Sequence, residues 1–283
     1  NATGGAIHII THKPAQDTEA RIKLTGGDYR RRNIEAMYNT PLSKDVAMRI
    51  TGSVLRRDGY VDNLNGDDVN EENRKNVRVS LLWDASDTTE AILRYSYEDM
   101  DQVGGVVNTL NSAAFEAANP GHRWDPFGAG AWDAPKQLEA RKMSSASLEV
   151  NHEIGEMTFT SITGWRDVDT KLLEDLDGSN NPMFYFAASN PEQSTFFSQE
   201  FRLTGATDAL KWTAGATYTT EELEHTTEAQ FLVSTFESFA LPPVFRQLGQ
   251  TIKPEEIPAF REARSEEHTS ELQSQFRISY AVF

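Results

Sequence analysis

The chain of 283 residues has no cysteine, no long apolar run and few basic residues. Without cysteine it has no disulfide framework and no thiolate metal site. No apolar stretch approaches the roughly 18 residues of a membrane-spanning helix, so the sequence excludes a helical membrane protein. With 27 lysines and arginines against 43 acidic residues the net charge is −16, and the clustered cations that nucleic-acid phosphates require are not found. We therefore expect no nucleic-acid partner.

Alternation of apolar and polar residues recurs along the chain. It is clearest from Ser194 to Glu222, where two alternating segments flank a tight turn at residues 205–208. The apolar face of the second segment consists of Leu210, Trp212, Ala214, Ala216 and Tyr218. In a soluble sheet such a face meets a protein core, and in a transmembrane barrel it meets lipid. The low mean hydropathy of −0.54 does not exclude the barrel, since only every second residue of a barrel strand is apolar.

The connections between the alternating segments differ systematically in length. Long polar loops are expected at residues 58–73, 102–140 and 169–193, and short turns separate them. Short periplasmic turns and longer extracellular loops are typical of outer-membrane barrels. We count about nine strands, each of about the 9 to 11 residues that cross a bilayer at a tilt. The sequence therefore predicts an all-β, antiparallel up-and-down transmembrane β-barrel that is incomplete.

Several segments resemble the TonB-dependent outer-membrane receptors. Residues 1–14, NATGGAIHIITHKP, are similar to the end of the plug domain of that family. The other similar segments, in the family's order, are Pro41-Leu42-Ser43, Arg56-Arg57-Asp58-Gly59-Tyr60, Ser161 to Arg166 and Ser198 to Thr204. The resemblance implies a large barrel of about 22 strands with a plugged lumen, so about nine strands form only part of its wall. We expect the last strand of the plug at residues 1–14 and a partial receptor barrel at residues 15–263.

The resemblance also implies a function, which is transport rather than catalysis. It implies active uptake of a scarce ligand of the siderophore-iron, cobalamin or oligosaccharide class across the bacterial outer membrane, with energy from the TonB complex. The expected partners are the TonB complex, outer-membrane lipid and the small-molecule ligand, and no cofactor is expected. By this resemblance we expect the TonB box and nearly all of the plug, which carry the coupling residues, to lie outside the given sequence. A passive outer-membrane barrel or surface adhesin, and a soluble carbohydrate-binding β-sandwich, remain as alternatives.

Candidate ligand-binding residues lie in the two longest loops, because exposed aromatic clusters on loops often bind ligands. They are His122, Trp124, Phe184, Tyr185 and Phe186. The alternative interpretation is that these side chains anchor the loops to each other or to lipid headgroups. The acidic side chains of residues 62–72 fit a solvated loop better than a calcium site, because their spacing does not match an EF-hand. We predict no catalytic site and no metal site.

Alternation also assigns side chains to the two faces of the expected wall. The lumen-facing charges should pair with charges of the plug or of neighbouring strands, and they are Arg94, Glu98, Glu149, Glu200 and Arg202. The lipid-facing residues are Leu81, Leu93, Tyr95, Leu148, Phe201, Leu203 and Trp212.

The last segment, Arg264 to Phe283, differs in pattern from the rest of the chain. Ile278, Tyr280 and Phe283 are similar to the aromatic C-terminal strand of outer-membrane barrels, but Ser265 to Gln275 is polar without alternation. Residues 264–274 and 278–283 resemble the in-frame translation of a sequencing adapter on either side of an index tag. We therefore expect residues 264–283 to be an artefactual tail that packs poorly or lies as a spurious strand or helix against an open edge.

Overall fold

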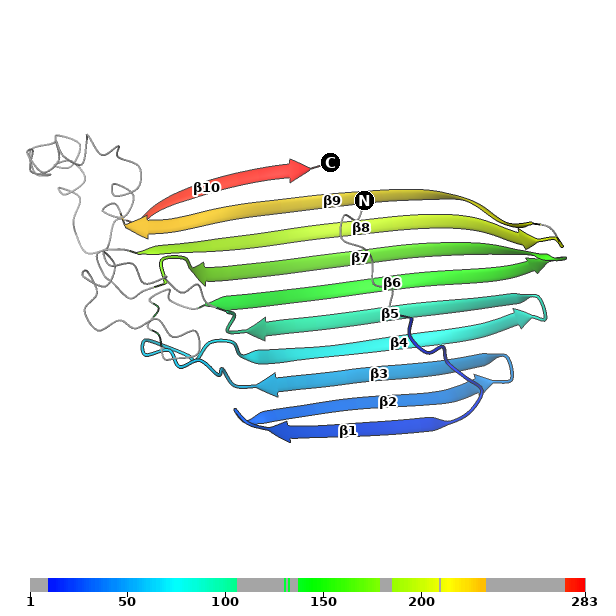
Figure 1. The fold of residues 1–283 in the computed structure, drawn as a ribbon, viewed down its shortest axis with the longest axis horizontal. Helices are drawn as coiled ribbons and strands as arrows, with labels where there is room; N and C mark the ends of the chain where they lie inside the picture. The colour runs from blue at the N-terminus through cyan, green and yellow to red at the C-terminus, as the bar shows by residue number, and fades with distance from the viewer. Residues whose placement is uncertain are drawn as a thin grey trace, which may run out of the picture.

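A computed structural model describes residues 10–105, 130, 132, 137–178, 185–208, 210–232 and 273–282 of the chain, with residues 231–232 and 273–282 described through their backbone. These residues form one antiparallel sheet in which each strand pairs with the next along the chain (Figure 1). The strands are β1 (Glu19–Gly27), β2 (Arg31–Ser43), β3 (Val46–Arg57), β4 (Glu72–Ser86), β5 (Thr89–Gln102), β6 (Leu138–Ile154), β7 (Met157–Asp175), β8 (Phe186–Ala206), β9 (Lys211–Leu232) and β10 (Gln273–Val282). The predicted up-and-down arrangement is confirmed, and β1 to β9 are the nine expected strands. No helix among the described residues has the length and hydrophobicity to cross a membrane.

Short turns gather at one end of the sheet and long connections at the other (Figure 1). The turns at the first end are residues 44–45, 87–88, 155–156 and 207–210. The exception is the β1–β2 turn, which is short although it lies at the loop end. Its Tyr29 and Arg30 have φ of 56° and 52°, a left-handed conformation that is unfavourable for residues with a Cβ. Hydrogen bonds from Arg31 N to Asp28 O (3.2 Å) and from Asp58 N to Tyr29 O (2.9 Å) hold this turn in place.

The pairing register brings apolar residues together on one face, which we call the apolar face. Leu81 lies opposite Leu93, and Leu93 lies opposite Leu148. Phe159 of β7 stacks on Phe201 of β8 with ring centroids 6.1 Å apart. Because side chains alternate strictly between faces, a one-residue slip would move this whole set to the other side. The face is exposed: Leu24 keeps 73%, Phe201 47% and Tyr218 63% of its accessible surface.

The opposite face, which we call the polar face, has a short buried apolar row near the turn end. Ala47 lies opposite Leu82, which lies opposite Ile92, and all three are buried. The N-terminal residues 10–18 run along this face between β5 and β1, drawn in dark blue in Figure 1. Pro14 within this segment is also buried. A single-layer sheet can bury residues only where something covers it, and residues 10–18 are the described part of the chain that lies there.

Two expectations about element bounds were wrong. The strands β6 to β9 have 17 to 22 residues rather than the expected length. The loop expected at residues 169–193 is mostly strand, because β7 and β8 continue to pair as far as Asp175 opposite Ala187. Both faces of this extension carry polar side chains, so the alternation that marks a half-buried strand fades while backbone pairing continues.

At both ends of the chain a strand was among the expected structures, and the described residues contain one only at the C-terminal end. Of the expected plug strand at residues 1–14, the first nine lie outside the described residues, and residues 10–15 form no strand. At the other end, β10 pairs antiparallel with β9 from Gln273 opposite Leu232 to Val282 opposite Leu223. It lies as a strand on the edge of the sheet, which is one of the expected placements. Its origin as an artefact stays a prediction.

Candidate functional site

Charged side chains on the polar face form cross-strand pairs. Nη1 of Arg94 on β5 lies 3.1 Å from Glu149 Oε2 on β6. Nearer the loop end of the same two strands, Glu98 Oε1 lies 2.6 Å from Arg141 Nη2. The predicted pairing with neighbouring strands is confirmed for both. Each pair is partly exposed, so each contributes about 1 kcal/mol or less.

Further pairs extend this pattern over the rest of the polar face. Arg202 pairs with Glu200 two residues away on β8. On the first strands Lys23 Nζ lies 2.8 Å from Glu35 Oε1. The polar face is thus lined with charge from β1 to β8, and the charges are largely neutralised in place.

Asn39 of β2 fastens the N-terminal segment to the polar face. Its side chain is fully buried, and its Nδ2 donates to the carbonyls of Ala15 (2.9 Å) and Asp17 (2.5 Å). Its Oδ1 accepts from Ala15 N (3.1 Å) and from Arg49 Nε (3.2 Å). All hydrogen-bonding groups of the amide are therefore used, which is the condition for burying one cheaply. The chain is fixed to the wall at residues 15–17.

Upstream of this point the segment is held more loosely. Lys13 forms an ion pair with Glu90 of β5, and both side chains are partly exposed. Next to it a cavity of about 480 Å³ lies between the segment and the wall. Ile10 and Thr11 line one side, and Arg78, Arg94 and Glu149 line the other. The arrangement places a polar, water-accessible space between residues 10–13 and the sheet.

At the loop end two long connections pack against each other. Val61 and Val69, which pair with each other, form a buried cluster with Val103 and Trp132. Backbone hydrogen bonds join the connections: Leu64 N donates to Gly130 O (2.9 Å) and Glu71 N to Val103 O (3.0 Å). Loops with a buried cluster and backbone pairing have a defined surface, which makes them suitable for selective ligand contact.

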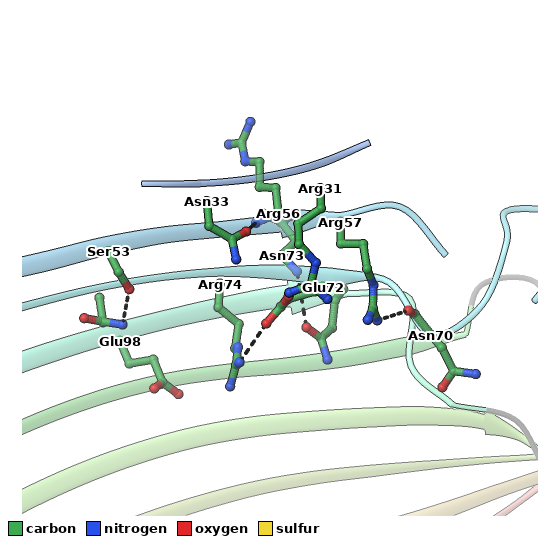
Figure 2. Close-up of polar contacts among 12 residues, drawn as sticks. Arg31, Asn33, Ser53, Arg56, Arg57, Asn70, Glu72, Asn73, Arg74 and Glu98 are labelled. Atoms are coloured by element: carbon green, nitrogen blue, oxygen red, sulfur yellow. Dashed lines mark hydrogen bonds and ion pairs between the residues drawn. The ribbon is translucent and has the colours of Figure 1, made fainter. Parts of the chain in front are cut away.

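A polar and aromatic rim connects this loop cluster to the strand ends, and Figure 2 shows its polar side chains. Arg57 Nη2 donates to Asn70 O at 2.8 Å, and its guanidinium lies 4.9 Å from the ring centroid of Tyr60. Tyr60 in turn meets Tyr29 edge-to-face with centroids 6.1 Å apart. Glu72 accepts from Arg74 (2.9 Å) and lies 3.7 Å from Arg31. The rim is thus an ordered surface that includes two partly exposed tyrosines.

The acidic side chains around this rim have structural roles. Asp68 accepts a hydrogen bond from Asn63 N (3.3 Å), and Glu71 accepts one from Val103 N (3.0 Å). No group of three or more metal-ligating side chains comes together in the part of the chain that the structure describes.

Of the five residues predicted to bind ligand, the structure describes Tyr185 and Phe186. His122, Trp124 and Phe184 lie outside the described residues. Tyr185 and Phe186 are half-buried, and Phe186 is the first residue of β8 rather than a loop residue. Its backbone N donates to Asp177 Oδ2 (2.8 Å) and its carbonyl accepts from Leu176 N (2.8 Å). The Phe186 backbone therefore closes the base of the 176–185 connection, and whether the predicted residues bind ligand stays a prediction.

Sequence reasoning missed Asn39 and Trp132. Asn39 sits in an alternating strand where a polar residue is expected, so nothing distinguishes it from a solvated one. Trp132 lies in a region predicted to be a long loop, and its sequence neighbours are alanine, glycine and aspartate, so no local pattern marks it as part of a buried cluster.

No protein-family model matches the sequence. Solved structures do match its fold. The closed form of the ferric-catecholate import receptor Fiu from Escherichia coli K12 superposes with a TM-score of 0.58, at 15% identity over 81% of this chain and 34% of that receptor. The siderophore receptor PiuA from Acinetobacter baumannii gives a TM-score of 0.60 at 14% identity over 78% of this chain and 32% of the receptor.

The ferric yersiniabactin uptake receptor FyuA from Yersinia pestis gives a TM-score of 0.60 at 15% identity over 78% of this chain and 36% of the receptor. The fold is that of a TonB-dependent receptor barrel. The chain spans about a third of the length of the solved structures it matches. Residues 15–17 lie against the polar face of this sheet, where Asn39 binds them.

Replacing Asn39 by alanine should release the N-terminal segment from the sheet. The change removes four hydrogen bonds between partly buried groups, to the Ala15 amide, the Ala15 and Asp17 carbonyls and Arg49 Nε, each contributing about 0.5 to 1.5 kcal/mol. Hydrogen exchange of the Ala15 amide measures the effect directly, and it should accelerate strongly in Asn39→Ala. Asn76→Ala is the control, since that exposed amide bonds only to Ser53 Oγ (2.7 Å). Unchanged protection of Ala15 in Asn39→Ala would refute the anchoring role.

Proposed function

We propose that the chain is part of the wall of an outer-membrane receptor that takes up a scarce ligand with energy from the TonB complex. The observation that carries the proposal is the pair of unlike faces across nine strands. One face exposes aliphatic and aromatic side chains over its whole width, and the other carries ion pairs and the N-terminal segment. In water such an apolar face would be an aggregation surface, whereas in a bilayer it is at its most stable.

The topology supports a barrel wall over the alternative of a soluble sandwich. All described strands belong to one sheet in sequential order, and no second sheet among them packs on the apolar face. A passive barrel or adhesin would share these faces. Energy-dependent uptake is supported over both by the likeness to siderophore receptors and by the segment fastened inside the wall, which suits a plug connection.

The ligand class we propose is a metal complex of a siderophore. Among the similar solved structures, Fiu is a ferric-catecholate import receptor, PiuA a siderophore receptor and FyuA a ferric yersiniabactin uptake receptor. Ligand capture would involve the ordered rim and the loop residues His122, Trp124, Phe184, Tyr185 and Phe186. Cobalamin and oligosaccharides are the other classes to test.

Uptake assays on the complete gene product separate these functions. Cells that express it should accumulate a ferric siderophore from a panel of labelled siderophores, cobalamin and oligosaccharides. Uptake should stop when the TonB protein is deleted or the proton gradient is collapsed, because binding alone does not drive transport. Uptake that continues without TonB would instead identify a passive barrel, and no uptake of any compound would favour an adhesin.

Aromatic substitutions test the ligand-binding residues. Trp124→Ala and Tyr185→Ala should each weaken binding of the transported compound by about tenfold, which corresponds to about 1.4 kcal/mol. Tyr218→Ala is the matched control, because that tyrosine is exposed on the apolar face of β9. Equal dissociation constants for all three variants and the unmodified protein would remove these loop residues from the site.

Adjacent positions on β6 test the membrane placement. Leu148 is exposed on the apolar face, and its neighbour Ser147 lines the cavity on the polar face. Leu148→Arg should lower the free energy of unfolding in bilayers by about 2 to 4 kcal/mol if the position lies near mid-membrane. Ser147→Arg should cost far less, because the added charge remains in water. Similar costs for the two variants would contradict the assignment of faces.

A further inference from the structure

Two arginines face each other on the apolar side of the sheet, at its loop end. Arg32 of β2 and Arg56 of β3 are direct partners in the register, and both are exposed. They lie on the same face as Ile34 and Val54, which occupy the next outward positions of the same strands. Like charges placed directly opposite each other on a sheet are destabilising. An anion bound between the two guanidinium groups would relieve their repulsion.

The protein itself does not supply that anion in the part that the structure describes. Neither guanidinium forms an ion pair with a described carboxylate, whereas the neighbouring Arg30, Arg31 and Arg74 all do. Figure 2 shows the Arg56 side chain reaching away from Arg57 and Glu72, to the other side of the strands. The arginine pair thus stands apart from the neutralised network of the rim.

Two adjoining apolar hollows lie directly beside the arginine pair. The first, of about 330 Å³, is lined by both arginines together with Leu24, Ile34 and Val54. The second, of about 380 Å³, shares Ile34 and Val54 and continues over Ala36, Gly52 and Val77. Ala36 and Gly52 contribute a single methyl group and no side chain, respectively, to the floor of this second hollow. The surface therefore combines a hydrocarbon-lined channel with a pair of guanidinium groups at its end.

The same end of the apolar face is acidic on other strands. Asp167 and Asp169 of β7, and Glu222 and Glu224 of β9, occupy the exposed outward positions beyond the apolar residues there. On β4 the outward Lys75 lines the second hollow and is paired with Asp99 at 3.0 Å. Because Lys75 and Asp99 neutralise each other, the surface around the arginine pair keeps the two positive charges of Arg32 and Arg56. Of the three regions compared at this end of the apolar face, only the one around Arg32 and Arg56 would attract an anion.

We propose that this surface binds an acylated phosphate lipid of the outer leaflet. An acyl chain would occupy the two hollows, and a phosphate would lie between Arg32 and Arg56. Arginine suits this role because its planar fork binds phosphate oxygens in pairs. The outer leaflet follows from the proposed function, in which the long connections are extracellular and the arginine pair lies at their end of the wall. The inference rests on that function for the presence of a membrane, but it can be tested separately.

The test measures lipid binding to the complete protein purified in an uncharged detergent. The probes are bisphosphorylated lipid A, lipid A without its phosphates, and phosphatidylglycerol. Unmodified protein should bind bisphosphorylated lipid A at least about tenfold more tightly than the double variant Arg32→Gln/Arg56→Gln, by analogy with other charge-assisted contacts. Lys142→Gln is the matched control, since Lys142 is exposed on the same face between Asp99 and Asp169 in the register, and it should bind like the unmodified protein.

A second variant keeps the result independent of folding. Arg56→Glu would place opposite charges across the strands, which favours pairing, and it should also abolish the preference for the phosphorylated probe. Equal binding of bisphosphorylated lipid A by all variants would overturn the proposal, as would arginine-dependent binding of phosphatidylglycerol with the same affinity. Arginine-dependent lipid A binding by a protein that transports nothing would support this inference while the uptake function fails.

Discussion

The structure depends on one constraint, which is the period-two register of an antiparallel sheet. Backbone hydrogen bonds between neighbouring strands, from β1 through to β9, fix which residues are opposed, and the pleat then sends neighbouring residues to opposite sides. The row of Leu81, Leu93 and Leu148, the Arg94–Glu149 pair and the buried amide of Asn39 all follow from this single alignment. None of them could be changed by a local rearrangement, because moving one strand by a residue would exchange its two faces.

The two faces of the sheet were predictable from the sequence, since alternation is local information. Arg94, Glu98 and Glu149, predicted on one face, form ion pairs on the polar face, and Leu93, Leu148 and Phe201 are exposed on the other face. The loop-end extensions of β7 and β8, residues 169–175 and 186–193, were not predictable from the sequence. Both faces of a strand can be polar in water, so these extensions show no alternation of apolar and polar residues. Their pairing is visible only once Asp175 is found opposite Ala187.

The candidate sites were less predictable than the faces, because they arise from residues far apart in the chain. Asn39 becomes an anchor only when residues 15–17 return to it, and Trp132 becomes part of a core only when two loops meet. Arg32 and Arg56 are 24 positions apart, so the sequence gives no sign that they form a cluster of positive charge. A local pattern can therefore predict the face on which a side chain lies, but not the distant residue that it contacts there.

The anchor at Asn39 has a mechanical consequence. Four hydrogen bonds tie residues 15–17 and Arg49 to one buried amide, so tension applied to the chain upstream is transmitted to β2 at that amide. Residues before Ala15 are held near the wall by the partly exposed ion pair of Lys13 and Glu90, which is a much weaker restraint. Under tension the Lys13–Glu90 contact would break first, and the chain from Ala15 onward would stay bound to Asn39. The sheet can thus keep its shape while residues 10–14 move away from it.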